Sequence, residues 1–439
     1  MRTFRRISRL DNNSKLSSLC QQGKDEIFHI SRRLRQFRRP ISLSNFRSYR
    51  TSIDTTTKTA ATRTISTISV QEVNIGNYND DDGNDSNNST TIMSQQQRMQ
   101  HKLAEIIRPY FKEQKPVVVR GAVLSTPATT LWSSWGYWQK KGGEQEHNVS
   151  VEMGGSYGSS TDAESKRVEI SFLAYLQFLQ LFEERHGRTG SINEFYHHHQ
   201  SDEGGSSNDS NSSSSTIPTN NELVYMAQND LFPSLYEDVM IPDFCCADDD
   251  DDDDDGKESI SNKDSDKNNS NNDNNKNTSV KAVGYGRLYS VMMWLGPRGC
   301  VSPLHFDPLD NCFMQHQGRK RVLLFPPSSS PSSNEPSFWH YAGHEGQQSN
   351  TSPINPEILD WQQSTTEQQR QDNTSSSDST IYDTATFKSY SKNYPLFFND
   401  APTRQECLLH PGDLLYIPKK WWHHVRSIDT SASINVWWR

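Results

Sequence analysis

A histidine and a carboxylate in the C-terminal half have the residue types and the spacing of a metal site. His305 and Asp307 stand two residues apart, between a hydrophobic stretch and a turn. In an extended strand, residues i and i+2 point to the same face, so both side chains would project together. Two histidines and one carboxylate hold non-haem Fe(II) on one side and leave its other positions open. The pair His423-His424 near the C-terminus offers the second histidine.

Oxidation with Fe(II) and O2 also needs a cosubstrate that supplies two electrons. A keto acid that chelates the iron can do this, and its remote carboxylate then needs a cation and a hydroxyl inside the fold. Lys320 alternates with apolar residues on the next strand-like stretch, and Tyr225 and Ser302 could supply hydroxyls. The alternative for Lys320 is a surface lysine, because arginines flank it on both sides.

Short strands separated by turns must position these residues. The expected strands of the C-terminal half cover residues 287–295, 301–307, 312–317, 320–325, 414–418, 423–427 and 432–438. Frequent short strands predict a β-sandwich or barrel with helices packed outside. An H-x-D pair alone is a weak signal, but a double-stranded β-helix would bring its strand beside the strand of the second histidine.

The region before these strands supplies helices and a few further strands. Residues 101–113 and 170–182 carry apolar side chains at helical spacing, so we expect amphipathic helices there. Residues 115–121 indicate a short buried strand that ends in a glycine turn, and residues 149–157 indicate a strand followed by a turn.

Polar segments limit how much of the 439-residue chain packs into a core, since only 32% of it is hydrophobic. Residues 200–221, 247–279 and 327–380 are rich in Ser, Asn, Asp, Gln or Thr. Such segments bury too little apolar surface to order themselves, so we expect disordered insertions in one domain over residues 100–439. The second insertion contains eight consecutive Asp. They could bind a divalent cation or a basic partner, although a solvated loop is the simpler interpretation.

The N-terminal region differs from the rest in charge. Residues 1–69 carry 15 Lys+Arg against four Asp+Glu, and residues 70–95 are rich in Asp, Asn and Ser. We therefore expect residues 1–99 to be a disordered basic leader followed by a polar linker. An Arg- and Ser-rich, acid-poor leader is typical of a mitochondrial or plastid transit peptide. The alternative is a basic tail on a nuclear or cytoplasmic protein.

The overall composition excludes several classes of function. The formal net charge is −9 despite the basic leader, so the acidic body argues against a nucleic-acid groove as the main surface. No run of residues approaches the ~18 apolar residues that cross a bilayer. The six cysteines form no C-x-x-C pair, which favours free thiols in a reducing compartment.

Several motifs resemble those of the JmjC-type Fe(II)/2-oxoglutarate oxygenases. The matching runs are VYMAQNDLF (224–232), IPDFC (241–245), WLGPRGCVSPLHFDPLDN (294–311), QGRK (317–320) and LHPGDLLYIPKKWWHHVR (409–426). The run at 294–311 is highly specific, and the resemblance covers residues 100–439 apart from the insertions. The most similar group is the small cupin-like hydroxylases that resemble the arginyl-hydroxylase with a single JmjC domain.

The resemblance implies a mainly β fold with flanking helices, the double-stranded β-helix (jelly roll) of cupin and JmjC proteins. The implied ligands of Fe(II) are His305, Asp307 and His423, because the aromatic-Trp-His motif selects His423 over His424. The residues implied to hold 2-oxoglutarate are Tyr225, Ser302, Asn311 and Lys320, with Asn435 in place of a smaller residue of the group. The positions implied to surround a substrate arginine are Glu152, Tyr157, Gln228 and Trp294.

The implied reaction is hydroxylation of a side chain in a protein or peptide, with arginine favoured. O2 would be the second cosubstrate, and succinate and CO2 the products. Glu152 beside Trp294 suits a guanidinium through charge pairing and cation–π contact. Two alternatives stay open: N-methyl-lysine demethylation by the same oxidant, and a catalytically silent binding module. A silent module would lose a ligand or Lys320, and neither is lost here. The sequence makes no prediction of the oligomeric state.

Overall fold

The structure is a computed structural model that describes part of the chain. The described residues are 67–77, 94–144, 147–156, 167–192, 218, 222–246, 280–327, 350–360, 389, 391–400 and 403–439. Most of the predicted leader, and most of the three predicted insertions, lie outside the described residues. No helix in the described ranges is long and apolar enough to span a membrane.

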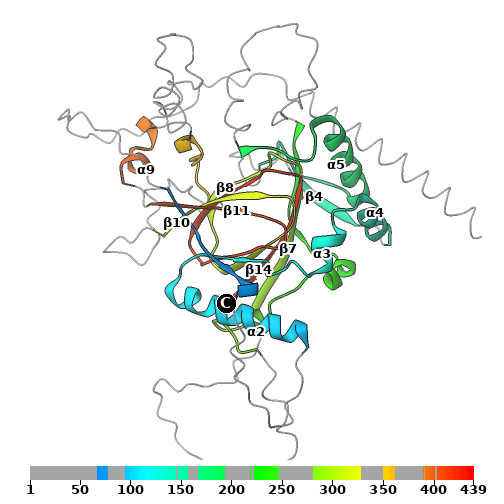
Figure 1. The fold of residues 1–439 in the computed structure, drawn as a ribbon. Helices are drawn as coiled ribbons and strands as arrows, with labels where there is room; N and C mark the ends of the chain where they lie inside the picture. Colours follow the sequence, from blue (N-terminus) through cyan, green and yellow to red (C-terminus); the bar gives the residue numbers. More distant parts are fainter. Residues whose placement is uncertain are drawn as a thin grey trace, which may run out of the picture.

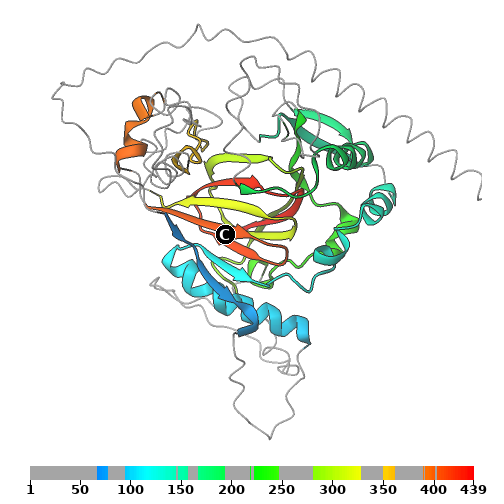
Figure 2. The ribbon, with the colours of Figure 1, turned by 45° about the horizontal axis from the view of Figure 1, so that its top comes forward.

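Two β-sheets face each other and form the core of a double-stranded β-helix, as the sequence predicts (Figures 1 and 2). The smaller sheet has the order β1 (Thr67–Ser69), β11 (Arg404–Leu409), β10 (Lys320–Phe325), β13 (Trp422–Ser427), β8 (Val301–Phe306). The larger sheet has the order β2 (Gln71–Asn74), β3 (Val117–Arg120), β12 (Leu414–Ile417), β9 (Asp310–Gln317), β14 (Ser431–Trp438), β7 (Leu288–Gly296), β6 (Val224–Asp230), β4 (Asn148–Met153), β5 (Arg167–Ser171).

Helices cover the outer face of the nine-stranded sheet, and one further helix lies beside the smaller sheet (Figure 1). The helices are α2 (Gln95–Glu113), α3 (Pro127–Leu131), α4 (Trp135–Glu144), α5 (Phe172–His186) and α9 (Pro395–Asp400), with 3-10 turns η1 (Ile75–Asn77), η5 (Pro233–Asp238) and η6 (Asp243–Cys245). The start of α2 is fixed by a capping box, in which Ser94 and Gln97 exchange hydrogen bonds through their side chains.

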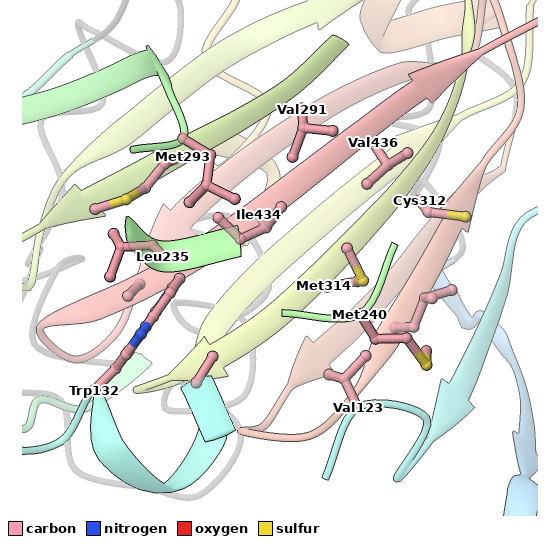
Figure 3. Close-up of a cluster of buried hydrophobic side chains, with 14 of the residues drawn as sticks. Val123, Trp132, Leu235, Met240, Val291, Met293, Cys312, Met314, Ile434 and Val436 are labelled. Carbon is pink, nitrogen blue, oxygen red and sulfur yellow. The ribbon is translucent and has the colours of Figure 1, made fainter. Parts of the chain in front are cut away.

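Alternation along the strands divides the apolar residues into two layers. Met293, Met314, Ile434 and Val436 point outward from the larger sheet into the cluster that also holds Trp132 of the helical layer (Figure 3). A second cluster fills one end of the space between the sheets, with Phe313, Val322, Leu324, Leu415 and Val425 among its members. The inward positions at the other end carry the polar residues of the candidate site.

The predicted strands of the C-terminal half are confirmed to within two residues at each end. The helix predicted at 170–182 begins instead at Phe172, because Ile170 belongs to β5 and Ser171 caps the helix by accepting from Ala174 N. The predicted leader 1–99 is wrong in part. Its residues 67–77 form β1, β2 and η1, and the two strands pair in parallel with β11 and β3.

The prediction of disorder over residues 327–380 is also wrong in part. Residues 350–360 lie on the outer face of the five-stranded sheet, where Ile354, Ile358 and Leu359 are buried. The polar composition of this segment predicts disorder, because its few apolar residues and its buried charges have their partners on strands of the folded sheet.

Candidate metal centre

Two histidines and a carboxylate converge between the sheets. His305 is the penultimate residue of β8, Asp307 directly follows the strand, and His423 on β13 pairs across the ladder with His305. The Nε2 atoms of His305 and His423 lie 4.0 and 3.7 Å from the two carboxylate oxygens of Asp307. One ligand atom of each residue lies within 4.8 Å of the ligand atoms of the other two, so the three residues can hold a metal ion. This arrangement presents three ligands from one side.

Backbone carbonyls orient both imidazoles toward Asp307. Nδ1 of His305 lies 2.7 Å from the carbonyl oxygen of Pro303, and Nδ1 of His423 lies 3.0 Å from that of Trp421. A proton on Nδ1 satisfies each carbonyl and leaves the Nε2 lone pair for a metal. Burial, together with the neighbouring His305, lowers the pKa of His423, so this imidazole is neutral as a metal ligand must be.

Strand alternation separates the two adjacent histidines of β13. His423 points into the space between the sheets, whereas His424 points outward, where its Nε2 lies 3.4 Å from Oε1 of Glu357. The geometry therefore agrees with the choice of His423 over His424 that the sequence motif implies.

Lys320 lies buried on the inner face of β10, not at the surface. Its Nζ donates to Oγ of Ser433 at 2.8 Å and lies 3.5 Å from the hydroxyl of Tyr225. Nζ also stands 5.3 Å from the ring centroid of Phe313. Among the described residues, no carboxylate lies within ion-pair distance of this ammonium. Burial accordingly lowers the pKa of Lys320 to about 7, although Cys300 opposes the shift.

Three further residues of the predicted 2-oxoglutarate site are buried on the inner faces. Ser302 lies on β8 opposite Val425 of β13. Asn435 Nδ2 donates to Oδ1 of Asn311 at 3.1 Å. The remaining amide atoms, Nδ2 of Asn311 and Oδ1 of Asn435, are buried without a hydrogen-bond partner in the described part of the protein. A buried donor and acceptor left over in this way favour a polar ligand beside them.

The structure brings three of the four predicted substrate residues close to Tyr225 or its strand. Glu152 of β4 pairs directly with Tyr225 of β6, and the ring of Trp294 lies 5.9 Å from that of Tyr225. Gln228 sits at a bulge later in β6, with a φ of 51°. The fourth residue, Tyr157, lies outside the described residues.

Glu152 already has a cationic neighbour within the chain. Nε of Arg167, the residue opposite it on β5, lies 3.8 Å from Oε1 of Glu152. The side chain of Glu152 is 11% exposed and that of Arg167 is 46% exposed. Arg167, Glu152 and Tyr225 therefore form one row across β5, β4 and β6, which leads from a half-exposed residue to a buried one.

Two residues of β14 that contact the site are not assigned by the sequence motifs. Ser433 receives the hydrogen bond of Lys320, and Nε1 of Trp437 donates to Oδ2 of Asp307 at 3.0 Å. Ser433, Asn435 and Trp437 are every second residue of β14 and share its inner face. The alternation of the strand could therefore have identified Ser433 and Trp437 once Asn435 was assigned to the site. Trp437 also joins Tyr225 and Trp294 in a small apolar cluster beside the site.

The donor set fits Fe(II) and 2-oxoglutarate. Two imidazoles and a carboxylate on one side match the facial arrangement of non-haem iron sites. A carboxylate of 2-oxoglutarate would supply the anion that the buried Lys320 lacks among the described residues, and the unpaired amide atoms of Asn311 and Asn435 could bind its polar groups.

Comparisons with known proteins agree with this site. Residues 103–439 match the sequence profile of the Cupin-like domain family. The chain is 27% identical over 332 residues to lysine-specific demethylase 8 of Xenopus tropicalis, covering 75% of this chain and 49% of that protein. It is 25% identical over 353 residues to lysine-specific demethylase JMJ30 of Arabidopsis thaliana, covering 80% of this chain and 56% of that protein.

A third relative is Jumonji C domain-containing protein 5 of Drosophila melanogaster, 32% identical over 218 residues. That match covers 49% of this chain and 36% of the relative. The chain thus spans about half the length, or less, of the curated relatives it matches. The family profile, the facing sheets and the similarity to these relatives together place the chain in the Cupin-like domain family, as a JmjC-type protein.

Proposed function

We propose that this chain is an Fe(II)- and 2-oxoglutarate-dependent oxygenase that oxidises a cationic side chain of a protein substrate. The observation that carries the proposal is the buried ammonium of Lys320, which faces the same interior as the His305–Asp307–His423 triad. In the described part of the chain, no carboxylate lies within ion-pair distance of this ammonium, and burial of an unpaired charge is destabilising. A module that only bound a partner would gain nothing that offsets this cost, whereas an oxygenase would gain a binding group for 2-oxoglutarate.

Each residue of the site has a task in this reaction. His305, Asp307 and His423 would hold Fe(II), which with 2-oxoglutarate supplies the activation of O2 for oxidising a C–H bond. Lys320 would pair with the remote carboxylate of 2-oxoglutarate, while Ser433 fixes the position of its Nζ. The aromatic cluster beside the triad limits access of water, which strengthens these charge interactions.

The preferred reaction is N-methyl-lysine demethylation. Two of the relatives described above are named lysine-specific demethylases, which supports this outcome over arginine hydroxylation. Glu152, with Tyr225 as its neighbour on the sheet, would attract the methylated ammonium at the entrance of the site.

Arginine hydroxylation is the second candidate. It is supported by the combination of an acidic Glu152 with the ring of Trp294 near Tyr225, since a planar guanidinium pairs with a carboxylate and stacks on an indole. Mass spectrometry of treated peptides separates the two reactions. Demethylation removes a methyl group and releases formaldehyde, whereas hydroxylation adds one oxygen atom and releases none.

The test of the oxygenase proposal is succinate formation from 2-oxoglutarate with Fe(II) and pools of peptides that contain N-methyl-lysine or arginine. We expect turnover by the wild type and none by His305→Ala. The matched control is His410→Ala, which alters a half-exposed histidine that contacts Asp413 rather than the triad. Absence of both turnover and Fe(II) binding in the wild type would rule out the proposal.

A further inference from the structure

The strand that carries His305 lies at the edge of its sheet, and a segment from a distant part of the sequence covers that edge. β8 is the terminal strand of the five-stranded sheet. The backbone N–H of Phe306 donates to the carbonyl of Asn350 at 3.0 Å, and that of Ser352 donates to Leu304 at 2.7 Å. A β-bridge joins His305 to Thr351. The edge of β8 beside His305 is therefore paired with this segment, although among the described residues no regular strand lies beyond β8 in the sheet.

An apolar cluster holds the rest of this segment on the outer face of the sheet. Ile354, Ile358 and Leu359 are at most 4% exposed. They pack with outward residues of three strands, namely Leu304 of β8, Leu323 and Phe325 of β10, and Trp422 of β13. Two of those residues, Leu304 and Trp422, immediately precede the metal-ligand histidines in sequence.

Buried charges fasten the segment to the neighbouring strands. Glu357 accepts two hydrogen bonds from Arg426 of β13, from Nε at 2.7 Å and from Nη2 at 2.5 Å. Burial alone would raise the pKa of Glu357, but Arg426 and His424 hold it well below its usual value. Asp360 accepts from Arg321 of β10 at 2.8 Å and from Arg404 of β11 at 2.6 Å.

The strands β8 and β13 contact this segment with their outer faces and carry metal ligands on or beside their inner faces. On β13, the outward side chains of His424 and Arg426 meet Glu357, while His423 between the outward Trp422 and His424 faces the metal site. On β8, Leu304 and Phe306 meet the segment, while His305 between them belongs to the triad. The distance between His305 and His423 therefore depends on the relative position of β8 and β13, which the segment joins on their outer face.

We infer that residues 350–360 form a clasp that positions His305 and His423 for metal binding from outside the barrel. The clasp rests on the proposed metal site and adds to it a determinant that contacts neither metal nor substrate. Glu357 and Asn350 are positioning residues, since one joins β13 to the clasp and the other joins β8 to it. Asn350 does so twice, because its Nδ2 also donates to the carbonyl of Phe306 at 2.9 Å.

The test compares Glu357→Gln with Glu72→Gln. Both glutamates accept two hydrogen bonds from an arginine, but the Glu72 pair joins β2 to Arg120 of β3 in the larger sheet, away from the metal strands and from the clasp. Co(II) serves as the probe, with its dissociation constant and its visible absorption spectrum as readouts. We expect Glu357→Gln to raise the Co(II) dissociation constant about tenfold and to alter the spectrum, and Glu72→Gln to change the constant less than about twofold.

A milder variant and a stability measurement separate positioning from a general loss of structure. Asn350→Ala removes one hydrogen bond to β8, and we expect it to weaken Co(II) binding about threefold. Thermal melting of each metal-free variant supplies the comparison. The inference is overturned if Glu357→Gln binds Co(II) like the wild type, or if both glutamine variants lose affinity in proportion to their melting temperatures. A wild type that binds no Co(II) would overturn the metal site itself together with the clasp.

Discussion

Trp437 and Asp307 are joined by a hydrogen bond of 3.0 Å from the indole Nε1 to Oδ2 of the carboxylate. The same oxygen lies 3.7 Å from Nε2 of His423. Asp307 follows the last residue of β8 and is not held by the ladder itself, so the indole is what fixes its side chain. The larger sheet thus orients a metal ligand that the smaller sheet carries.

Replacing Trp437 by Phe should weaken metal binding while keeping the aromatic wall. Loss of the indole donor frees the carboxylate of Asp307, and removal of such an outer partner typically costs about tenfold or more in metal affinity. Titration with Co(II) measures the change. Trp438→Phe is the matched control, because its indole points to the opposite face and donates to the carbonyl of Val283. We expect that control to lower thermal stability and leave Co(II) affinity unchanged, and equal losses of affinity in both variants would contradict this role of Trp437.

Lys320→Met should separate cosubstrate binding from folding. The variant removes a charge-assisted contact worth about 1.5–3 kcal/mol, so we expect the 2-oxoglutarate dissociation constant to rise about 10- to 100-fold. It also removes a buried ammonium that has no carboxylate partner among the described residues, so the ligand-free variant should melt at a higher temperature than the wild type. Calorimetric titration and thermal melting measure the two effects. A 2-oxoglutarate affinity equal to that of the wild type would exclude Lys320 as the anchor.

The pKa of about 7 for Lys320 predicts the pH dependence of cosubstrate binding. Below that pH the lysine is already charged in the free protein, so the dissociation constant for 2-oxoglutarate should be flat. Above it, binding must take up a proton, and the constant should rise by up to about tenfold per pH unit. Titrations from about pH 6 to about pH 9 test this, with Lys320→Met expected to show no such slope. A wild-type affinity that increases with pH would contradict the assignment.

Glu152 and Arg167 should have opposite effects on a cationic peptide substrate. Glu152→Gln removes the charge that attracts the substrate, so we expect KM to rise about tenfold with little change in kcat. Arg167→Gln removes the internal competitor for Glu152 and should lower KM about twofold, a small effect because the pair is partly exposed. Arg185→Gln, which breaks an exposed pair with Glu222, is the control. A higher KM for Arg167→Gln would show that the arginine supports the site rather than competing for it.

Alternation and turn chemistry in the sequence predict the strands that carry the site. The bounds of β10 match the predicted stretch, and the triad His305, Asp307 and His423 follows from residue type and motif. Ser433 and Trp437 were harder to assign, because a serine or tryptophan on an inward strand position looks the same whether it contacts a metal ligand or fills space. Their roles depend on partners more than 100 residues away.

The clasp was not predicted, for a different physical reason. Glu357 and Asp360 lie among polar residues and look like solvated charges in sequence, since a carboxylate is almost never buried unless it is paired. The arginines that pair with them, Arg321, Arg404 and Arg426, come from three other strands. Only the sheet assembles these five charges, so no local pattern marks the segment as folded.

The opposite directions of His423 and His424 have a consequence for how the length of this chain can vary. Insertion of one residue within β13, between Trp422 and His423, would turn the following side chains of the strand to the other face, which would carry His423 outward to Glu357 and His424 inward. Single substitutions on β13 are therefore a smaller perturbation than any odd change in its length. Insertions and deletions are expected to accumulate instead where strands end, and a homologue with a shifted β13 register would have exchanged its metal ligand for a clasp contact.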